Sequence, residues 1–121
     1  LVALRPGLVL ANPERLSMDT IPEFLKDWEI IFSPPMENQE RHSPDYLQQA
    51  IGSEWIDMNL FSLGPDTVVV DSYQTGLIAL LESKGLEVIP LTLRHSRMMG
   101  GGFHCVTLDT RRRGTMESYF S

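Results

Sequence analysis

The residues most able to do covalent chemistry lie around the single cysteine of the sequence. Cys105 follows three consecutive glycines at 100–102 and lies near the start of an apolar segment at 103–108. Glycine lets the backbone approach a ligand without a Cβ, and the β-branched and aromatic residues of the segment predict a buried strand. A thiol between a ligand-permissive loop and a rigid strand suits a nucleophile. A lone cysteine is more often an inert small hydrophobe, so the case depends on its neighbours.

One further charged residue could face a site beside such a nucleophile. Arg15 lies in the turn after a predicted strand at 8–10, and its planar guanidinium could pair both oxygens of a carboxylate. Composition alone favours a solvated surface charge for it.

The elements that must position these residues follow an α/β order. Turn-forming Pro-Gly, Asn-Pro and Gly-Pro dipeptides separate β-branched runs that predict strands. Strands are expected at 8–10, 30–32, 67–71, 87–91 and 103–108, and helices at 20–27, from 43 to about 52 and at 77–84. Both halves therefore repeat a rough β-α-β unit, which predicts an α/β fold class. A small α/β sandwich fits this pattern.

Two of these helices carry specific signals. Residues 20–23 have the spacing of a capping box, and Phe24, Leu25 and Trp28 would lie on one side of the short helix that follows. The apolar residues of 77–84 recur at helical spacing before a terminating glycine, as expected for an amphipathic helix.

Composition excludes several classes of function. The chain has 121 residues, a net charge of −6 and a pI near 4.9, which argues against nucleic acid or anionic membrane as a partner. The only basic cluster is at 111–113. No apolar run approaches the roughly 20 residues that span a bilayer. One cysteine cannot form an internal disulfide, which fits a reducing compartment such as the cytoplasm. The sequence opens with Leu1 inside an apolar run, which we interpret as a partial sequence.

Three strings resemble the arginine:glycine amidinotransferases. GGGFHC at 100–105, followed by RRRG at 111–114, resembles the C-terminus of that family. PGLVLANPER at 6–15 looks like its PGIVLSNPDR segment, and WIDMN at 55–59 looks like its WLSMN segment. The resemblance covers essentially the whole sequence but only about the last third of the family's chains. It implies that residues 1–121 are the C-terminal part of one catalytic domain, the last two or so blades of a fivefold pseudosymmetric α/β propeller, the pentein fold.

The resemblance also implies a reaction. The family moves the amidino group of L-arginine to an amine, glycine in its name-giving members, and yields guanidinoacetate and ornithine through an amidino-cysteine that matches Cys105. Arg15 matches the arginine that grips the substrate's carboxylate. Ser53 matches the second of two serines that contribute to binding arginine, and Gly52 replaces the first. The family implies no cofactor, no metal and a homodimer at full length.

The general acid/base is expected outside these residues. In the family a His-x-Asp motif supplies it, just before the segment that matches Leu1. His104 adjoins Cys105, but adjacent residues on a strand face opposite sides, so His104 is expected to be structural. His42 is expected in an exposed loop, and His95 has no supporting pattern. Asp57 is expected to be solvated.

Three functions from different classes compete. The first is the amidinotransferase, for which secondary-metabolite members leave the acceptor amine open. The second is a guanidine-group hydrolase of the same superfamily, of the deiminase type, in which water replaces the acceptor. The third is a non-enzymatic α/β binding module in which Cys105 is buried and inert. The GGGFHC and RRRG strings favour the transferase.

Overall fold

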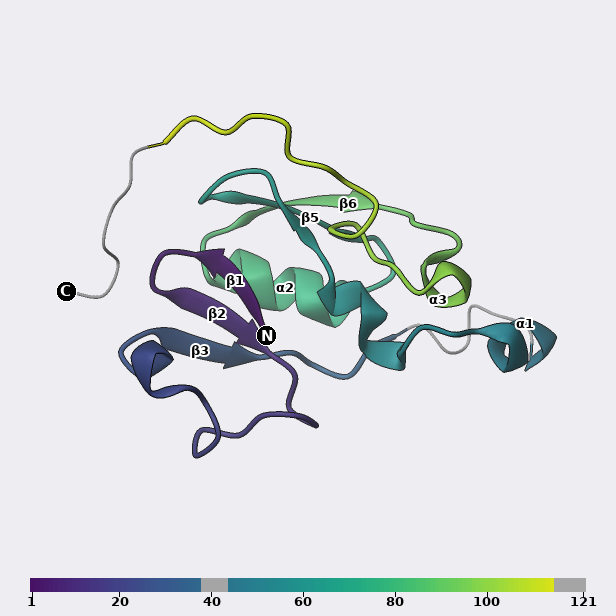
Figure 1. Ribbon diagram of the computed structural model, residues 1–121, viewed down its shortest axis with the longest axis horizontal. Coiled ribbons are helices and arrows are strands. Elements are labelled where there is room, and N and C mark those ends of the chain that lie inside the picture. Colours follow the sequence, from purple (N-terminus) through teal and green to yellow (C-terminus); the bar gives the residue numbers. More distant parts are fainter. Residues whose placement is uncertain (38–43, 115–121) are drawn as a thin grey trace.

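The computed structural model describes residues 1–37 and 44–114 (Figure 1). Among the described helices, η1 and η3 are short 3₁₀ helices, and α1, α2 and α3 are α-helices. In chain order the elements are β1 (Val2–Arg5), β2 (Leu8–Ala11), η1 (Glu23–Leu25), β3 (Glu29–Phe32), α1 (Pro44–Gln49), η3 (Glu54–Met58), β4 (Phe61–Ser62), β5 (Thr67–Asp71), α2 (Thr75–Ser83), β6 (Glu87–Leu91) and α3 (Ser96–Met99). Within the described ranges no helix is both long and apolar enough to cross a bilayer.

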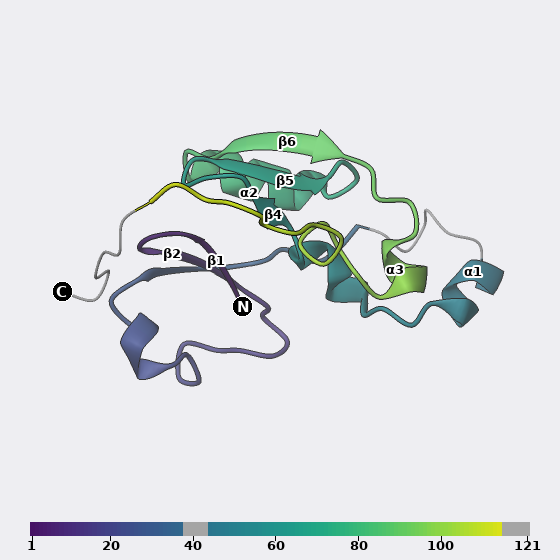
Figure 2. The same ribbon diagram turned by 45° about the horizontal axis from the view of Figure 1, so that its top comes forward.

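The strands form two three-stranded sheets with the same topology. In the first sheet β1 and β2 are antiparallel and β3 joins β2 in parallel. In the second sheet β4 and β5 are antiparallel and β6 joins β5 in parallel. Figures 1 and 2 show the two sheets as separate groups of strands. The repetition expected from the order of elements is confirmed, with an additional short strand at the start of each unit.

One core joins the two sheets. It contains Leu8 and Leu10 from β2, Val70 from β5, and Leu77 and Leu81 from α2, each at most 2% exposed. Because side chains alternate along a strand, the other residues of β2 face the opposite side and pack in a second cluster with the η1 segment. Both faces of β2 are therefore covered, and the turn that follows it starts from a rigid base.

The start of α2 is fastened by Glu37. The Glu37 carboxylate accepts hydrogen bonds from the Thr75 hydroxyl at 2.8 Å and from the Gly76 N–H at 3.2 Å. The bond from Thr75 is the main cause that lowers the pKa of Glu37. A carboxylate at this end of a helix is also favoured by the helix dipole.

The predicted helix at 20–27 is much shorter in the structure, and the predicted extent is wrong. Only the three residues of η1 are helical, and no side chain caps them. The Thr20 hydroxyl instead accepts from the Ser17 N–H at 2.9 Å and donates to the Ser17 carbonyl at 3.1 Å. Thr20 thus closes a turn before the helix and is not part of a capping box. Leu25 is buried as expected, whereas Phe24 is 64% exposed.

The prediction of a strand at 103–108 is also wrong, because these residues form no strand. Residues 103–106 form a turn, in which the Val106 N–H reaches the Gly102 carbonyl at 3.2 Å. Val106 and Leu108 are 61% and 86% exposed. The N–H groups of residues 104 and 105 bind one asparagine, and so no ladder forms. The unexpected helix α3 precedes the glycines and ends at Gly100, which has a φ of +70°, an angle that suits glycine.

The remaining expectations agree with the structure. The strands at 8–10, 30–32, 67–71 and 87–91 and the helix at 77–84 are present, with ends that differ by one or two residues. The helix α1 begins at Pro44, and the expected cap Ser43 lies outside the described residues. The expected loop residue His42 also lies outside them.

Candidate active site

Asn59 holds the backbone around the Cys105 thiol through its side-chain oxygen and its backbone carbonyl. The Cys105 N–H donates to Asn59 Oδ1 at 3.0 Å, and the His104 N–H donates to the Asn59 carbonyl at 3.2 Å. Asn59 is the C-cap of η3. Cys105 itself is exposed, so the expectation of a buried cysteine is wrong. The structure presents an accessible thiol on a backbone that is fixed at two consecutive amides.

The glycine loop fits tightly against η3. A Cβ at Gly102 would lie 2.6 Å from the Asn59 carbonyl oxygen and 2.9 Å from the Ile56 carbonyl oxygen. A Cβ at Gly101 would lie 3.0 Å from the Cβ of Cys105. The last two glycines therefore permit a close backbone approach, while the first ends α3.

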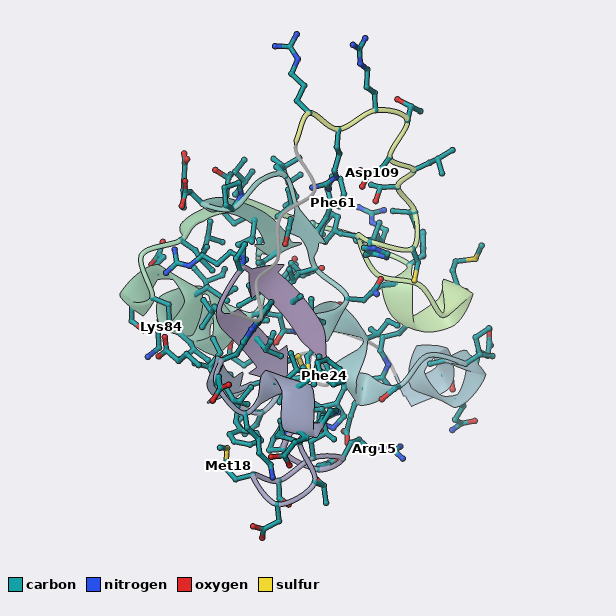
Figure 3. All side chains as sticks on the ribbon, turned by 60° about the vertical axis from the view of Figure 1, so that its left-hand side comes forward. Arg15, Met18, Phe24, Phe61, Lys84 and Asp109 are labelled. Carbon is teal, nitrogen blue, oxygen red and sulfur yellow. The ribbon has the colours of Figure 1, made fainter. Side chains whose placement is uncertain are left out.

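Arg15 lies in the turn after β2, at the surface of the molecule (Figure 3). It lines a cavity of about 290 Å³ together with Trp55 and Asn59. The Trp55 indole N–H donates to Glu14 Oε2 at 2.8 Å, which fastens this turn to η3. The structure therefore brings Arg15 into the same cavity as the residue that holds Cys105.

Ser53 lies at the other end of η3. It is the N-cap of that helix, and its hydroxyl accepts from the Trp55 N–H at 3.1 Å. This bond leaves the hydroxyl proton available to a ligand. The preceding Gly52 N–H donates to the Arg97 carbonyl at 2.7 Å. One short helix therefore connects Ser53 to Asn59, and a hydrogen bond connects its start to α3.

His104 faces a second cavity. This cavity has a volume of about 430 Å³, and His104, Asn59 and Arg112 are among the residues that line it. Asn59 thus lines both the His104 cavity and the Arg15 cavity, as does Leu1. The reason given above for separating His104 from Cys105 is wrong, since both lie in a turn and not on a strand.

Arg112 fixes the tail after the turn to β4. Arg112 donates through Nε to Asp109 Oδ2 at 2.6 Å and through Nη2 to the Ser62 carbonyl at 2.8 Å. Its guanidinium carbon lies 6.0 Å from the centre of the Phe61 ring. The hydrogen bond from Arg112 is the main cause that lowers the pKa of Asp109.

Asp57 is a buried carboxylate, and the expectation that it is solvated is wrong. It is 5% exposed. Asp57 Oδ2 accepts from Gln74 Nε2 at 2.8 Å, and the Ser96 hydroxyl lies 3.5 Å from Oδ1. Asp57 therefore joins η3 to the starts of α2 and α3. Its partners are distant in sequence, so the residues next to Asp57 do not predict its burial. In the same way, the residues next to Asn59 do not predict its bond to Cys105.

Other candidate ligands do not converge. His95 is exposed and is the N-cap of α3. Among the described residues no three His, Cys, Asp or Glu side chains are placed to hold a metal ion.

Comparison with known proteins confirms the resemblance to amidinotransferases. No family model matches the sequence. The chain is 47% identical over 124 residues to inosamine-phosphate amidinotransferase 1 of Streptomyces glaucescens, covering 98% of this chain and 33% of that protein. It is 39% identical over 116 residues to the mitochondrial glycine amidinotransferase of Xenopus tropicalis, covering 96% of this chain and 26% of that protein.

A solved structure agrees with these sequence relatives. The inosamine-phosphate amidinotransferase of Streptomyces griseus superposes with a TM-score of 0.87 at 48% identity, over 99% of this chain and 33% of that one. The chain is therefore homologous to amidinotransferases along nearly its whole length. It spans about a third of the length of these Streptomyces relatives.

Proposed function

We propose that this chain is the nucleophile-bearing part of an amidinotransferase that takes the amidino group of L-arginine. The observation that carries the proposal is the exposed Cys105 thiol on a backbone held by Asn59 at 3.0 Å, in a homologue of amidinotransferases. A thiolate is a good nucleophile that can also leave again. These two properties are what a double displacement requires.

The proposed reaction has two steps. In the first, the Cys105 sulfur bonds to the guanidinium carbon of arginine, the bond from that carbon to the side-chain nitrogen breaks, and this nitrogen takes a proton and leaves as ornithine. In the second, an acceptor amine bonds to the same carbon, the carbon–sulfur bond breaks, and the amine loses a proton. The thiolate is regenerated.

Arg15 and Ser53 are proposed to bind the arginine. Arg15 would pair the α-carboxylate, which a planar guanidinium can hold through two hydrogen bonds. Ser53 would donate its remaining hydroxyl proton. Their support is that Arg15 shares a cavity with Asn59, and that Ser53 begins the helix that Asn59 ends.

The general acid/base histidine is proposed to come from residues that precede Leu1 in the family's chains. Leu1 lines the Arg15 cavity and also the His104 cavity, which supports a position for these residues beside Asn59. His104 lines the second of these cavities and is not proposed for this role. The two sheets of identical topology support the related proposal that residues 1–121 form two blades of a pentein propeller within one catalytic domain.

The acceptor is proposed to be an amine that also carries an anionic group. Glycine, which the resemblance implied, is such an amine. The relatives are named for inosamine phosphate and for glycine, and a phosphate and a carboxylate are both anionic.

The proposal is tested by trapping the intermediate. The full-length enzyme is incubated with arginine labelled in the guanidino carbon, without acceptor, and its peptides are analysed by mass spectrometry. We expect one labelled amidino group on the peptide containing Cys105, ornithine in solution, and neither in Cys105→Ala. Release of labelled citrulline would instead identify the deiminase-type hydrolase. An unmodified Cys105 with no product would support the binding module and refute the proposal.

A further inference from the structure

Arg97 is a partly buried cation with unused hydrogen-bond donors. It lies on α3, and its Nε and Nη1 are buried without a hydrogen-bond partner among the described residues. A guanidinium stays charged in proteins, and buried charges are normally paired. Unpartnered buried donors therefore call for a ligand that the structure does not hold. A water could accept a hydrogen bond, but only an anion also balances the charge.

The backbone that carries Arg97 is held in place. The Gly52 N–H donates to the Arg97 carbonyl at 2.7 Å. A Cβ at Gly52 would lie 2.9 Å from the Arg97 carbonyl oxygen and 3.3 Å from its Cα. The close approach of these two segments thus depends on glycine, at the position where the resembled family has serine. Arg97 is consequently fixed relative to Ser53.

The buried carboxylate of η3 is engaged elsewhere. Asp57 of η3 takes the Gln74 amide at 2.8 Å and has the Ser96 hydroxyl at 3.5 Å. Neither Arg97 Nε nor Nη1 bonds to it. Asp57 positions α3 through Ser96, and Arg97 is left to bind another anion.

Arg97 is also close to the nucleophile along the chain. The Gly101 N–H donates to the Ser96 carbonyl at 3.2 Å, as is usual where a helix ends at a left-handed glycine, so Gly101 lies against the residue before Arg97. A Cβ at Gly101 would in turn lie 3.0 Å from the Cβ of Cys105. A small acceptor could therefore reach from Arg97 to the thiol.

We propose that Arg97 binds the anionic group of the acceptor amine, a carboxylate or a phosphate, while that amine attacks the amidino group on Cys105. This inference rests on the proposed function. It gives the two substrates separate cations: Arg15 in the cavity beside Trp55 for arginine, and Arg97 on α3 for the acceptor.

The test separates the two half-reactions in the full-length enzyme. The amidino-cysteine is first formed with labelled arginine, and its decay is then followed with matched acceptors: glycine against glycinamide, and 2-aminoethyl phosphate against ethanolamine. The variants are Arg97→Met, Arg97→Lys, and Arg111→Met as a control that removes an exposed arginine. We expect Arg97→Met to form the adduct at the wild-type rate but to lose roughly tenfold to a hundredfold of the preference for an anionic acceptor.

The pattern of losses identifies the ligand and the role. If the preference is lost only between glycine and glycinamide, the anionic group that Arg97 binds is a carboxylate. If it is lost only between 2-aminoethyl phosphate and ethanolamine, that group is a phosphate. Arg97→Lys should keep part of the preference, and Arg111→Met all of it. The inference would be overturned if the Arg97→Met enzyme lost the same fraction of its decay rate with anionic and neutral acceptors, or formed the adduct more slowly. Either result would show a structural role for Arg97. A wild-type enzyme without adduct would refute the proposed function, whereas a normal adduct with unchanged preference refutes Arg97 alone.

Discussion

The substitution Gly102→Ala should disrupt the site through one added methyl group. Its Cβ would lie 2.6 Å from the Asn59 carbonyl oxygen, 2.7 Å from the Asn59 Cβ and 2.9 Å from the Ile56 carbonyl oxygen. Two of these atoms are backbone, and the third is joined directly to it, so no flexible side chain can rotate away. The loop and η3 must separate by at least about 0.4 Å for the shortest contact to reach 3.0 Å. The same Asn59 holds the amides of residues 104 and 105.

The expected cost has two parts. Overpacking of a close contact costs about 1–3 kcal/mol, and each weakened hydrogen bond to Asn59 costs about 0.5–1.5 kcal/mol. With both hydrogen bonds weakened, the free energy of unfolding should therefore fall by about 2–6 kcal/mol. A displacement of the thiol by even a fraction of an ångström should lower the rate of ornithine formation further, by up to roughly a hundredfold.

The assay compares melting temperature and initial rate of ornithine formation in the full-length enzyme. Gly64→Ala is the matched control, because a Cβ at Gly64 meets no atom within 4 Å, and this change should alter stability by less than about 1 kcal/mol. Wild-type melting temperature and wild-type rate in Gly102→Ala would refute the view that the loop is held by close packing on η3.

Three further outcomes are expected. Arg15→Lys should raise the Michaelis constant for arginine roughly tenfold to a hundredfold but leave turnover of agmatine, which lacks the carboxylate, unchanged; equal losses with both substrates would show a role in folding. Gly52→Ser should lower the melting temperature, because its Cβ would lie 2.9 Å from the Arg97 carbonyl oxygen, and an unchanged melting temperature would contradict this contact. The pKa of Glu37 is lowered from its ordinary value of 4.5, mainly by the Thr75 hydroxyl, so its contribution to stability is present above about pH 4.5 and is lost as pH falls through the lowered pKa. Glu37→Gln should reduce the loss of stability measured by urea denaturation below pH 4.5, and an identical pH dependence in both proteins would rule out this contribution.

The elements that the sequence predicted well are those with local causes. The strand β5 is a run of β-branched residues after a Gly-Pro-Asp turn, and α2 has helical apolar spacing before Gly85, whose φ is +78°. Such signals act within a few residues, and packing of β5 and α2 in the shared core agrees with them. Local preference and tertiary contact point the same way there.

The site was less predictable because long-range contacts decide it. The segment 103–108 has the composition of a strand, yet the bond from the Cys105 N–H to Asn59 spans 46 positions and holds it in a turn. Strand preference needs a ladder to be expressed, and the turn provides none. Asp57 is buried for a similar reason, since its partner Gln74 is 17 positions away. The neighbours of Cys105 in sequence predict it as the nucleophile, but they do not predict Asn59, the residue that holds its backbone.

The hydrogen bonds from the turn to Asn59 also affect which electrophiles the Cys105 thiol can attack with backbone assistance. Attack on a carbonyl carbon creates an oxyanion, which enzymes stabilise with preorganised N–H donors. At this thiol the two adjacent amides, of residues 104 and 105, are already bonded to Asn59 oxygens at 3.2 Å and 3.0 Å. Attack on a guanidinium carbon creates no oxyanion, because it removes positive charge spread over nitrogen atoms. These two amides are thus not free to stabilise the oxyanion of an ester or amide, whereas amidine chemistry does not require them.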